Sequence, residues 1–243
     1  MLIAFISDIH ANLPALKAAI AAARSRKAEK IICAGDITGY GPYPNETCLY
    51  LEKNGVISIR GNYDRKVLEV IEHGESAVKD LQKKKRALVI WTAKAINKPA
   101  RRFLTSLAGQ IEEEYPPKYR ILVVHGSAVS DDDDVYPSIT STGLESKLGG
   151  VQPDIFVCGH THVPFVKKIN RTLVVNCGST GQPVDGDPMP SFALLNISRE
   201  GLHAHIIRFP YEVEETVKAL KKTSLPKKLQ RDFAEGLKRR FLE

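Results

Sequence analysis

The segment Leu2-Ile3-Ala4-Phe5-Ile6-Ser7-Asp8-Ile9-His10 places an aspartate and a histidine directly after an apolar run. The run reaches Asp8 at once and is too short for the apolar region of a signal peptide, so it predicts a β-strand. One Asp-x-His motif decides little by itself. An aspartate alone could cap the next helix, and a lone histidine is more often a core or surface residue than a ligand.

Four further polar groups follow short apolar runs in the same way. The runs cover residues 30–33, 56–59, 120–124 and 155–157, and each is followed within a few residues by Asp, Asn or His. In an open α/β sheet the loops after the carboxyl ends of the strands share one edge, where ligands bind. We therefore expect seven side chains to meet in one site: Asp8, His10, Asp36, Asn62, His125, His160 and His162.

This set of side chains predicts a site for two divalent metal ions. Imidazole and carboxylate together suit Mn, Fe, Co, Ni or Zn, with Mn the first choice here. A carboxylate can bridge two cations about 3.5–4 Å apart, and a hydroxide held between them is a nucleophile at neutral pH. Asp36 is the natural bridge. Asp8, His10 and one later histidine would hold one metal, and Asn62 with two histidines the other. We expect Asp36, Asn62 and His125 to take a direct part in catalysis.

The order Asp-x-His, Gly-Asp, Gly-Asn, His-Gly and Gly-His-x-His resembles the calcineurin-like metallophosphoesterases. The segment Asp8-Ile9-His10-Ala11-Asn12-Leu13-Pro14-Ala15-Leu16 is similar to small prokaryotic phosphoesterases with the motif D-I-H-x-N-L-P-A-L. Gly39-Tyr40-Gly41-Pro42 and Gly178-Ser179-Thr180-Gly181-Gln182-Pro183 extend the resemblance, which covers residues 1 to about 225.

The resemblance implies a fold and a distribution of ligands. The fold is an α/β, four-layer αββα sandwich of two mixed sheets flanked by helices, with the dinuclear site at one edge. By position in the motifs, the first metal would take Asp8, His10, Asp36 and His162. The second would take Asp36, Asn62, His125 and His160.

The chain departs from the family pattern at two positions. Gly39 stands where many members carry a second aspartate after Asp36. Tyr63 stands where efficient phosphomonoesterases often carry a histidine that protonates the leaving oxygen. Tyr63 and Asp64 are therefore candidate contacts to the substrate or its leaving group, and an aromatic side chain that only packs at the rim is the stronger interpretation of Tyr63.

Length and composition favour one catalytic domain over residues 1–243. A chain of this length can bury roughly three quarters of its unfolded surface. Its 43% hydrophobic and 26% charged residues are ordinary for a globular protein. No apolar run approaches the roughly 20 residues that span a bilayer. The four cysteines lack a Cys-x-x-Cys spacing, which favours buried thiols in a reducing cytoplasm over disulfides.

The pattern also predicts how the elements are arranged. Helices are expected over residues 14–27 and 45–53, and a helical cap within the domain over about 65–110, as a source of substrate selectivity. After His162, strands at 165–169, 172–176, 192–197 and 202–209 are expected to build the second sheet. The tail from 212 to 243 is expected to be helical and basic, with a break at Pro226.

The formal net charge of +7 raises the question of a nucleic-acid partner. Contact clusters would be Lys83-Lys84-Lys85-Arg86, Lys227-Lys228 and Lys238-Arg239-Arg240. Basic runs on helices are usually solvated, and no known nucleic-acid motif is present, so this partner is not favoured. The acidic run 131–134 is interpreted as a solvated loop, with repulsion of highly charged substrates or binding of another cation as alternatives.

Together these features predict a cytoplasmic, metal-dependent phosphoesterase with a small phosphate-ester substrate and no membrane partner. Phosphodiesters or activated phosphate esters are favoured over alkyl monoesters, with attack by the metal-bridging hydroxide. Two other functions stay open: a non-catalytic protein-interaction scaffold of the same fold, and a metal-dependent nuclease. The substrate, the native metal and the oligomeric state are not determined by the sequence.

Overall fold

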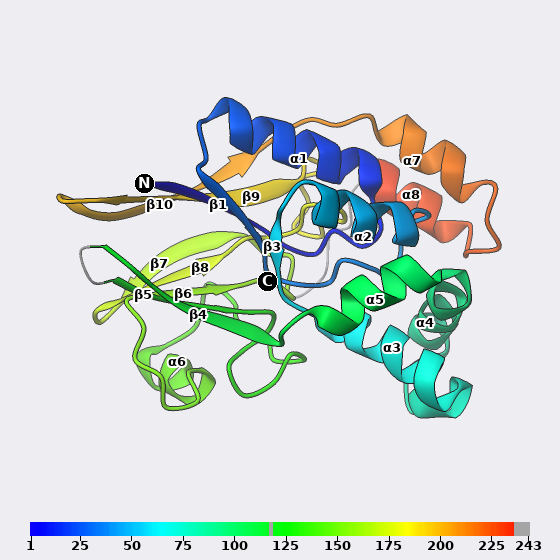
Figure 1. Ribbon diagram of the computed structural model, residues 1–243, viewed down its shortest axis with the longest axis horizontal. Coiled ribbons are helices and arrows are strands. Elements are labelled where there is room, and N and C mark those ends of the chain that lie inside the picture. The colour runs from blue at the N-terminus through cyan, green and yellow to red at the C-terminus, as the bar shows by residue number, and fades with distance from the viewer. Residues whose placement is uncertain (117–118, 236–243) are drawn as a thin grey trace.

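The computed structural model describes residues 1–116 and 119–235 and contains two packed β-sheets with helices on their outer faces (Figure 1). The strands are β1 (Leu2–Ile6), β2 (Lys30–Cys33), β3 (Ile57–Ser58), β4 (Gln110–Tyr115), β5 (Tyr119–Val124), β6 (Ile155–Cys158), β7 (Phe165–Ile169), β8 (Thr172–Asn176), β9 (Ser191–Ser198) and β10 (Gly201–Arg208). The helices are α1 (Leu13–Ser25), α2 (Pro44–Lys53), α3 (Asn62–His73), the 3-10 helix η1 (Glu75–Val78), α4 (Lys83–Ala95), α5 (Lys98–Ser106), α6 (Ser141–Lys147), α7 (Val213–Leu220) and α8 (Lys228–Glu235).

The first sheet has the strand order β10-β9-β1-β2-β3. β1 pairs in parallel with β2, with Ile3 opposite Lys30 and Ile6 opposite Cys33, and β2 pairs in parallel with β3. β9 is antiparallel to both β1 and β10. Because β1, β2 and β3 are parallel, the loops after them leave the sheet at one edge.

The second sheet has the strand order β4-β5-β6-β8-β7. Its three central strands are parallel, and the edge strands β4 and β7 are antiparallel to their neighbours. The loops after β5 and β6 therefore leave this sheet together as well. The five loops that carry the predicted ligands come from two sheets, three from the first and two from the second, and not from one continuous sheet.

The hairpin of β9 and β10 lies in the first sheet, so the prediction that these two strands belong to the second sheet is wrong. Turn residues show that two strands pair with each other, but they do not show which sheet the hairpin joins. β9 has apolar residues on both faces, with Phe192 in the helix-facing core and Ala193 and Leu195 in the core between the sheets. A strand that is buried on both faces suits a central place beside β1.

The core between the sheets follows the two-residue period of the strands. Ile3 and Phe5 of β1 face alternate residues of β5, β6 and β8 across this core. Ala4 and Ile6 point the other way, where they pack with Leu16 and other apolar residues of α1. Each strand of a pleated sheet sends successive side chains to opposite faces, so β1 serves two cores at once.

Helices cover the outer face of each sheet and complete the four-layer αββα sandwich. α1, α2 and α5 share the core cluster on the outer face of the first sheet. Leu144 of α6 and Leu148 pack on the outer face of the second sheet, which faces away from the first (Figure 1). α1 begins after Asn12, whose Oδ1 accepts a hydrogen bond from the Ala15 amide at 3.3 Å, and Pro14 occupies its first turn.

The segment expected as a cap is largely helical, but its helices divide between two cores. α5 belongs to the layer on the first sheet. Val67 of α3 and Leu88 of α4 pack instead with Leu229 and Phe233 of α8. That α3 and α4 act as a selective cap stays a prediction. β4, directly after this segment, and α6 were not predicted.

The tail forms α7 and α8, with Pro226 in the break between them. The predicted basic cluster Lys238-Arg239-Arg240 lies outside the described residues. Within the described part of the chain, no helix is both long enough and apolar enough to cross a membrane.

Candidate metal centre

The seven predicted ligands meet where the two sheets present their carboxyl ends. Asp8 and His10 follow β1, Asp36 follows β2, and Asn62 is the first residue of α3 after β3. From the second sheet, His125 follows β5, and His160 and His162 follow β6. All are buried except His160, whose side chain is 18% exposed, so the site lies under the rim of the sandwich.

The backbone of these loops is tightly turned. Asp8, His10, Asp36, His160 and His162 all have positive φ, between 49 and 63°. Non-glycine residues pay roughly 1–3 kcal/mol for such conformations and adopt them where the surroundings fix the chain. The Asp8 amide donates to the Gly35 carbonyl at 3.0 Å and the His10 amide to that of Asp36 at 2.9 Å, so the loops hold one another.

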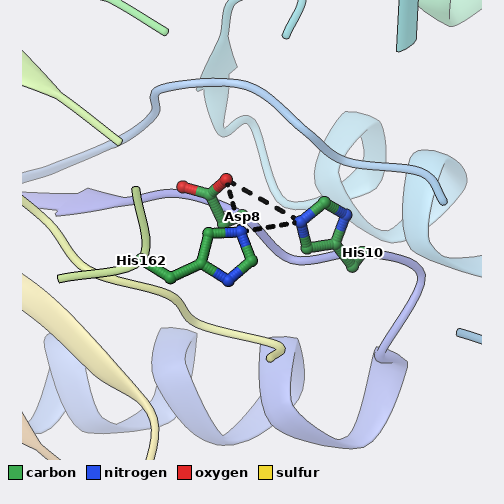
Figure 2. Close-up of side chains that lie close together, drawn as sticks. All are labelled: Asp8, His10 and His162. Atoms are coloured by element: carbon green, nitrogen blue, oxygen red, sulfur yellow. Dashed lines mark hydrogen bonds and ion pairs between the residues drawn. The ribbon is translucent and has the colours of Figure 1, made fainter. Parts of the chain in front are cut away.

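Asp8, His10 and His162 form one potential ligand group (Figure 2). Asp8 Oδ1 lies 3.1 Å from His162 Nε2 and 3.8 Å from His10 Nε2. The two imidazole Nε2 atoms are 3.0 Å apart. Figure 2 shows that the three side chains point toward one another, although His162 is separated from the other two by more than 150 residues.

Asp8, Asp36 and His125 form a second group. His125 Nε2 is 3.4 Å from Asp36 Oδ1 and 4.0 Å from Asp8 Oδ1. Asp36 also reaches the first group, because its Oδ2 lies 3.7 Å from His10 Nε2. Both carboxylates therefore stand between the two groups of histidines. His160 lies beside the second group, with Nδ1 3.3 Å from His125 Nε2.

Outer hydrogen bonds fix which ring nitrogen of each histidine faces the site. The Nδ1 atoms of His10, His125 and His162 lie 3.1, 2.8 and 2.6 Å from the carbonyl oxygens of Thr38, Ala34 and Gln182. A carbonyl only accepts, so each Nδ1 donates its proton, and each ring turns its Nε2 atom inward, where the neutral form offers a lone pair.

The resulting arrangement fits a metal ion. Two inward lone pairs on His10 and His162, 3.0 Å apart, repel unless a cation or a proton lies between them. Asp8 Oδ2 accepts from the Ser7 hydroxyl at 2.7 Å and the His160 amide at 3.0 Å. Asp8 Oδ1 and Asn62 Oδ1 are buried without a hydrogen-bond partner among the described residues. Buried oxygens of this kind usually require a partner, and bound cations would satisfy them.

Burial and mutual contact strongly shift the titration of these groups. Burial raises the pKa of Asp8, but His162, His125 and His10 outweigh it and hold that pKa well below its usual range. Burial lowers the pKa of His10 to about 4. His125 is also buried, yet the charge of Asp36 and its hydrogen bond raise the pKa of His125 to about 10. The centre thus holds ionised carboxylates beside one imidazole with a lowered pKa, that of His10, and one with a raised pKa, that of His125.

Asp64 is buried, and its carboxylate binds neighbouring backbone and hydroxyl groups. Its Oδ2 accepts from the amides of Ile37 and Gly61, both at 3.1 Å, and its Oδ1 from the amide and hydroxyl of Thr38, both at 2.8 Å. This carboxylate joins the loop after β2 to the start of α3. A contact to a leaving group would require several of these bonds to break.

Tyr63 is buried beside the site. Its hydroxyl is 2.5 Å from that of Tyr40, and both rings stand edge-on to the imidazole of His10. The Tyr63 amide donates to Asp36 Oδ1 at 2.8 Å. The backbone of this residue thus supports a predicted ligand while its ring lines the cavity.

A cavity of about 370 Å³ opens above the centre. Some of its lining residues were not predicted as site residues: Tyr40, Lys85, Asp132, Asp134 and Tyr136. Lys85 was seen only as part of a basic run, and Asp132 and Asp134 only as part of an acidic one. Nothing in the sequence of either run indicates that it borders the site.

The acidic run is partly exposed, as the favoured prediction has it, but its carboxylates also pair with basic side chains. Asp131 and Asp132 are bound by Arg65, and Asp132 also by Lys66. Asp133 pairs with Lys147 at 3.0 Å. Burial raises the pKa of Asp132, but hydrogen bonds from Lys66 and Asn62 lower it to about 2.

Comparison with known proteins agrees with the fold. Residues 1–200 match the family model of the calcineurin-like phosphoesterase superfamily domain. An uncharacterised protein of Methanocaldococcus jannaschii is 30% identical over 242 residues, covering 93% of this chain and 94% of its own. The phosphodiesterase YfcE of Escherichia coli is 23% identical over 81% of this chain and 88% of its own.

Solved structures show the same fold. A hypothetical protein of Pyrococcus horikoshii superposes with a TM-score of 0.86, and a metallophosphoesterase of Sphaerobacter thermophilus with 0.78. Each is 24% identical and covers 98% of this chain, with 99% of its own chain covered. The architecture and its buried carboxylate–imidazole centre are those of a metal-dependent phosphoesterase. The chain belongs to the calcineurin-like phosphoesterase superfamily.

Proposed function

We propose that the protein is a dinuclear metal-dependent phosphoesterase that hydrolyses phosphodiesters or activated phosphate esters. One observation carries most of the proposal. Two groups of inward-facing imidazole and carboxylate atoms share Asp8 and are spanned by Asp36, which reaches His10 with one oxygen and His125 with the other. A single cation would use only part of this set.

The two ions would divide the ligands as the family motifs suggest. Asp8, His10, Asp36 and His162 would hold the first, and Asp36, Asn62, His125 and His160 the second. Two such ions, with Mn preferred over Fe, Ni, Co or Zn, would supply electrostatic activation of water and of the phosphoryl group at neutral pH.

The protein's own residues provide charge, orientation and shelter. Asp8 and Asp36 bring the negative charge that balances two dications. The bonds from Nδ1 of His10, His125 and His162 to carbonyls keep each Nε2 turned inward. Asn62 adds a neutral oxygen, so one side of the centre stays more electrophilic toward a phosphate oxygen. We assign direct roles in turnover to Asp36, Asn62 and His125.

Tyr63 supports the preference for diesters and activated esters. A phenol is a weaker acid at neutral pH than an imidazolium. Esters whose leaving group departs as a stable anion need little protonation, and alkyl monoesters need it most. The four described cysteines are free and buried, which supports a cytoplasmic site of action.

A substrate panel on metal-reconstituted protein tests the proposal. The protein is stripped with chelator, loaded with each candidate metal and assayed on an aryl phosphodiester, an aryl monoester, a cyclic nucleotide, a dinucleoside polyphosphate and single-stranded DNA. We expect Mn-dependent hydrolysis of the aryl diester and two metals per chain by elemental analysis. Two bound metals without hydrolysis of any substrate would favour a scaffold. Cleavage of DNA alone would favour a nuclease.

A further inference from the structure

The carboxamide of Asn62 is oriented by a residue outside the predicted ligand set. Asn62 Nδ2 donates to Asp132 Oδ1 at 2.6 Å. An ionised carboxylate only accepts hydrogen bonds, so the amide nitrogen of Asn62 must face Asp132. Asn62 Oδ1 then takes the opposite direction, and it is buried without a hydrogen-bond partner in the described part of the chain. Since Asn62 also lines the cavity, this oxygen is the atom available to a cation there.

Asp132 is itself held on both oxygens. Lys66 Nζ donates to Oδ1 at 2.5 Å and Arg65 Nη2 to Oδ2 at 2.8 Å. Arg65 also binds Asp131 with two nitrogens, at 2.7 and 2.8 Å, and Glu69 at 2.8 Å. The acidic loop is therefore fastened to α3 by charge-assisted hydrogen bonds, which are shorter and stronger than neutral ones.

The spacing of the α3 residues makes this attachment possible. Arg65, Lys66 and Glu69 follow Asn62 by three, four and seven positions, which places all four side chains on one face of the helix. The acidic loop lies along that face. It contacts the arginine and the lysine on one side and the ligand amide on the other.

We propose that Asp132 is a positioning residue that fixes the amide of Asn62 with its oxygen toward the metal centre. This role rests on the proposed function, because it matters only if Asn62 binds a metal ion. A rotated amide would present its NH2 group to the cation, which removes a ligand and adds repulsion. Arg65 and Lys66 keep Asp132 ionised and in place.

The orientation can be measured without any metal. In metal-stripped, 15N-labelled protein, the Asn62 side-chain NH2 signal is assigned by its loss in Asn62→Ala. We expect this NH2 to exchange slowly with solvent in the wild type and in Asp131→Asn, and at least about tenfold faster in Asp132→Ala, since its partner is gone. Equal protection in Asp132→Ala would overturn the proposal.

Metal titration by calorimetry gives an independent readout. Loss of an outer hydrogen bond to a ligand typically costs 10–100-fold in affinity, so we expect about that loss at one of two Mn sites in Asp132→Ala. Asp132→Asn keeps an acceptor oxygen, so its Mn affinity should lie between that of the wild type and that of Asp132→Ala. The control Asp131→Asn removes the same charge from the neighbouring residue, and should cost at most about threefold because Glu69 and Asp132 still hold Arg65. Equal losses in Asp131→Asn and Asp132→Asn would mean that loop charge alone acts, against the proposal.

A reciprocal exchange excludes a merely structural role. Asn62→Asp places two carboxylates face to face and should weaken the site. Asn62→Asp combined with Asp132→Asn restores a donor–acceptor pair with the roles exchanged, and should recover at least about tenfold in affinity over Asn62→Asp alone. Additive losses would refute positioning. A wild type that binds no metal would refute the proposed function, while the exchange rate of the Asn62 NH2 still decides the orientation. Circular dichroism melts confirm that each variant is folded.

Discussion

Asp36 faces both halves of the centre, with one oxygen 3.4 Å from His125 Nε2 and the other 3.7 Å from His10 Nε2. Asp36→Asn replaces this carboxylate by a neutral amide, which neither balances two dications nor bridges them well. We expect loss of at least one of two metals and of nearly all activity, about 10³-fold or more. Elemental analysis and diester hydrolysis measure this, with Asp80→Asn, an exposed carboxylate, as the control. Full activity with two metals bound would end the dinuclear proposal.

His125 links metal affinity to pH. Burial lowers the pKa of His125, but the effect of Asp36 is larger and raises that pKa to about 10. The imidazole without a bound metal is therefore protonated at neutral pH. A ligand must give up that proton, so binding should release protons and tighten as pH rises from 6 to 9. His10, with a pKa lowered to about 4, is already neutral and should release none. Calorimetry in buffers of different ionisation heat counts the protons. Constant affinity over this range would contradict the assignment.

Tyr63 sets the expected dependence on the leaving group. A positioned general acid typically contributes about 10²–10⁴-fold, and a phenol is a poor donor at neutral pH. The wild-type rate should fall steeply as the leaving-group pKa rises, provided that chemistry limits turnover. Tyr63→His should flatten this slope and raise activity on alkyl monoesters, if the imidazole reaches the leaving oxygen. Tyr63→Phe separates acid function from packing. Equal wild-type rates on aryl and alkyl esters would show that another group supplies the proton.

At the scale of elements, the start of α3 depends on one close approach. A Cβ on Gly61 would lie 2.2 Å from the Asp36 amide nitrogen and 2.3 Å from its Oδ1. The φ of Gly61 is −92°, which any residue adopts, so the clash and not backbone strain decides the effect. Gly61→Ala should cost about 1–3 kcal/mol in the free energy of unfolding and weaken metal binding.

The matched control for this change is Gly109→Ala. No heavy atom lies within 4 Å of a Cβ at that position, so the change in the free energy of unfolding should stay within about 0.5 kcal/mol. Urea unfolding of both variants measures the difference. Equal stability of the two would show that the loops around Asp36 yield more easily than their contacts suggest.

The sequence predicts elements whose apolar pattern is local and strong. The bounds of β1, β2, β7 and β8 agree with the predicted runs, because each is a short apolar run or half of a tight hairpin. β4 was missed because its consecutive glutamates at 112–114 hide the alternation of an edge strand. Charges on an edge strand discourage pairing with other chains, so this composition has a structural reason.

The seven residues of the site were predictable because their sequence signal is also local. The side-chain contacts around them were not. Side chains that follow strands can be located from the strand ends, and all seven predicted ligands lie together. The contact of Asp132 with Asn62 joins residues 70 positions apart through an irregular loop, and no periodicity marks it. The sheet of β9 and β10 was equally hidden, since it depends on where the loop between β8 and β9 carries the chain.

At the scale of the whole molecule, metal binding should stabilise the sandwich. Ligands from both sheets would be joined by the same ions, and unfolding separates them. At a free metal concentration of 100 Kd the linkage is worth about 2.7 kcal/mol per site. Chelator should therefore lower the melting temperature by several degrees in calorimetric scans, and Mn should restore it. Asp36→Asn should respond much less. An unchanged wild-type midpoint would argue against tight binding by the native fold.

The strand order of the first sheet has a consequence for how the protein is made. β1 is synthesised well before one of its two neighbours, since β9 begins about 190 residues later. Until that segment leaves the ribosome, β1 has one unpaired edge, and the loop after β8 cannot bond the backbone of Ser7 and Asp8. The loop that carries Asp8 and His10 therefore lacks these hydrogen bonds during most of synthesis, so a complete centre can form only late in translation.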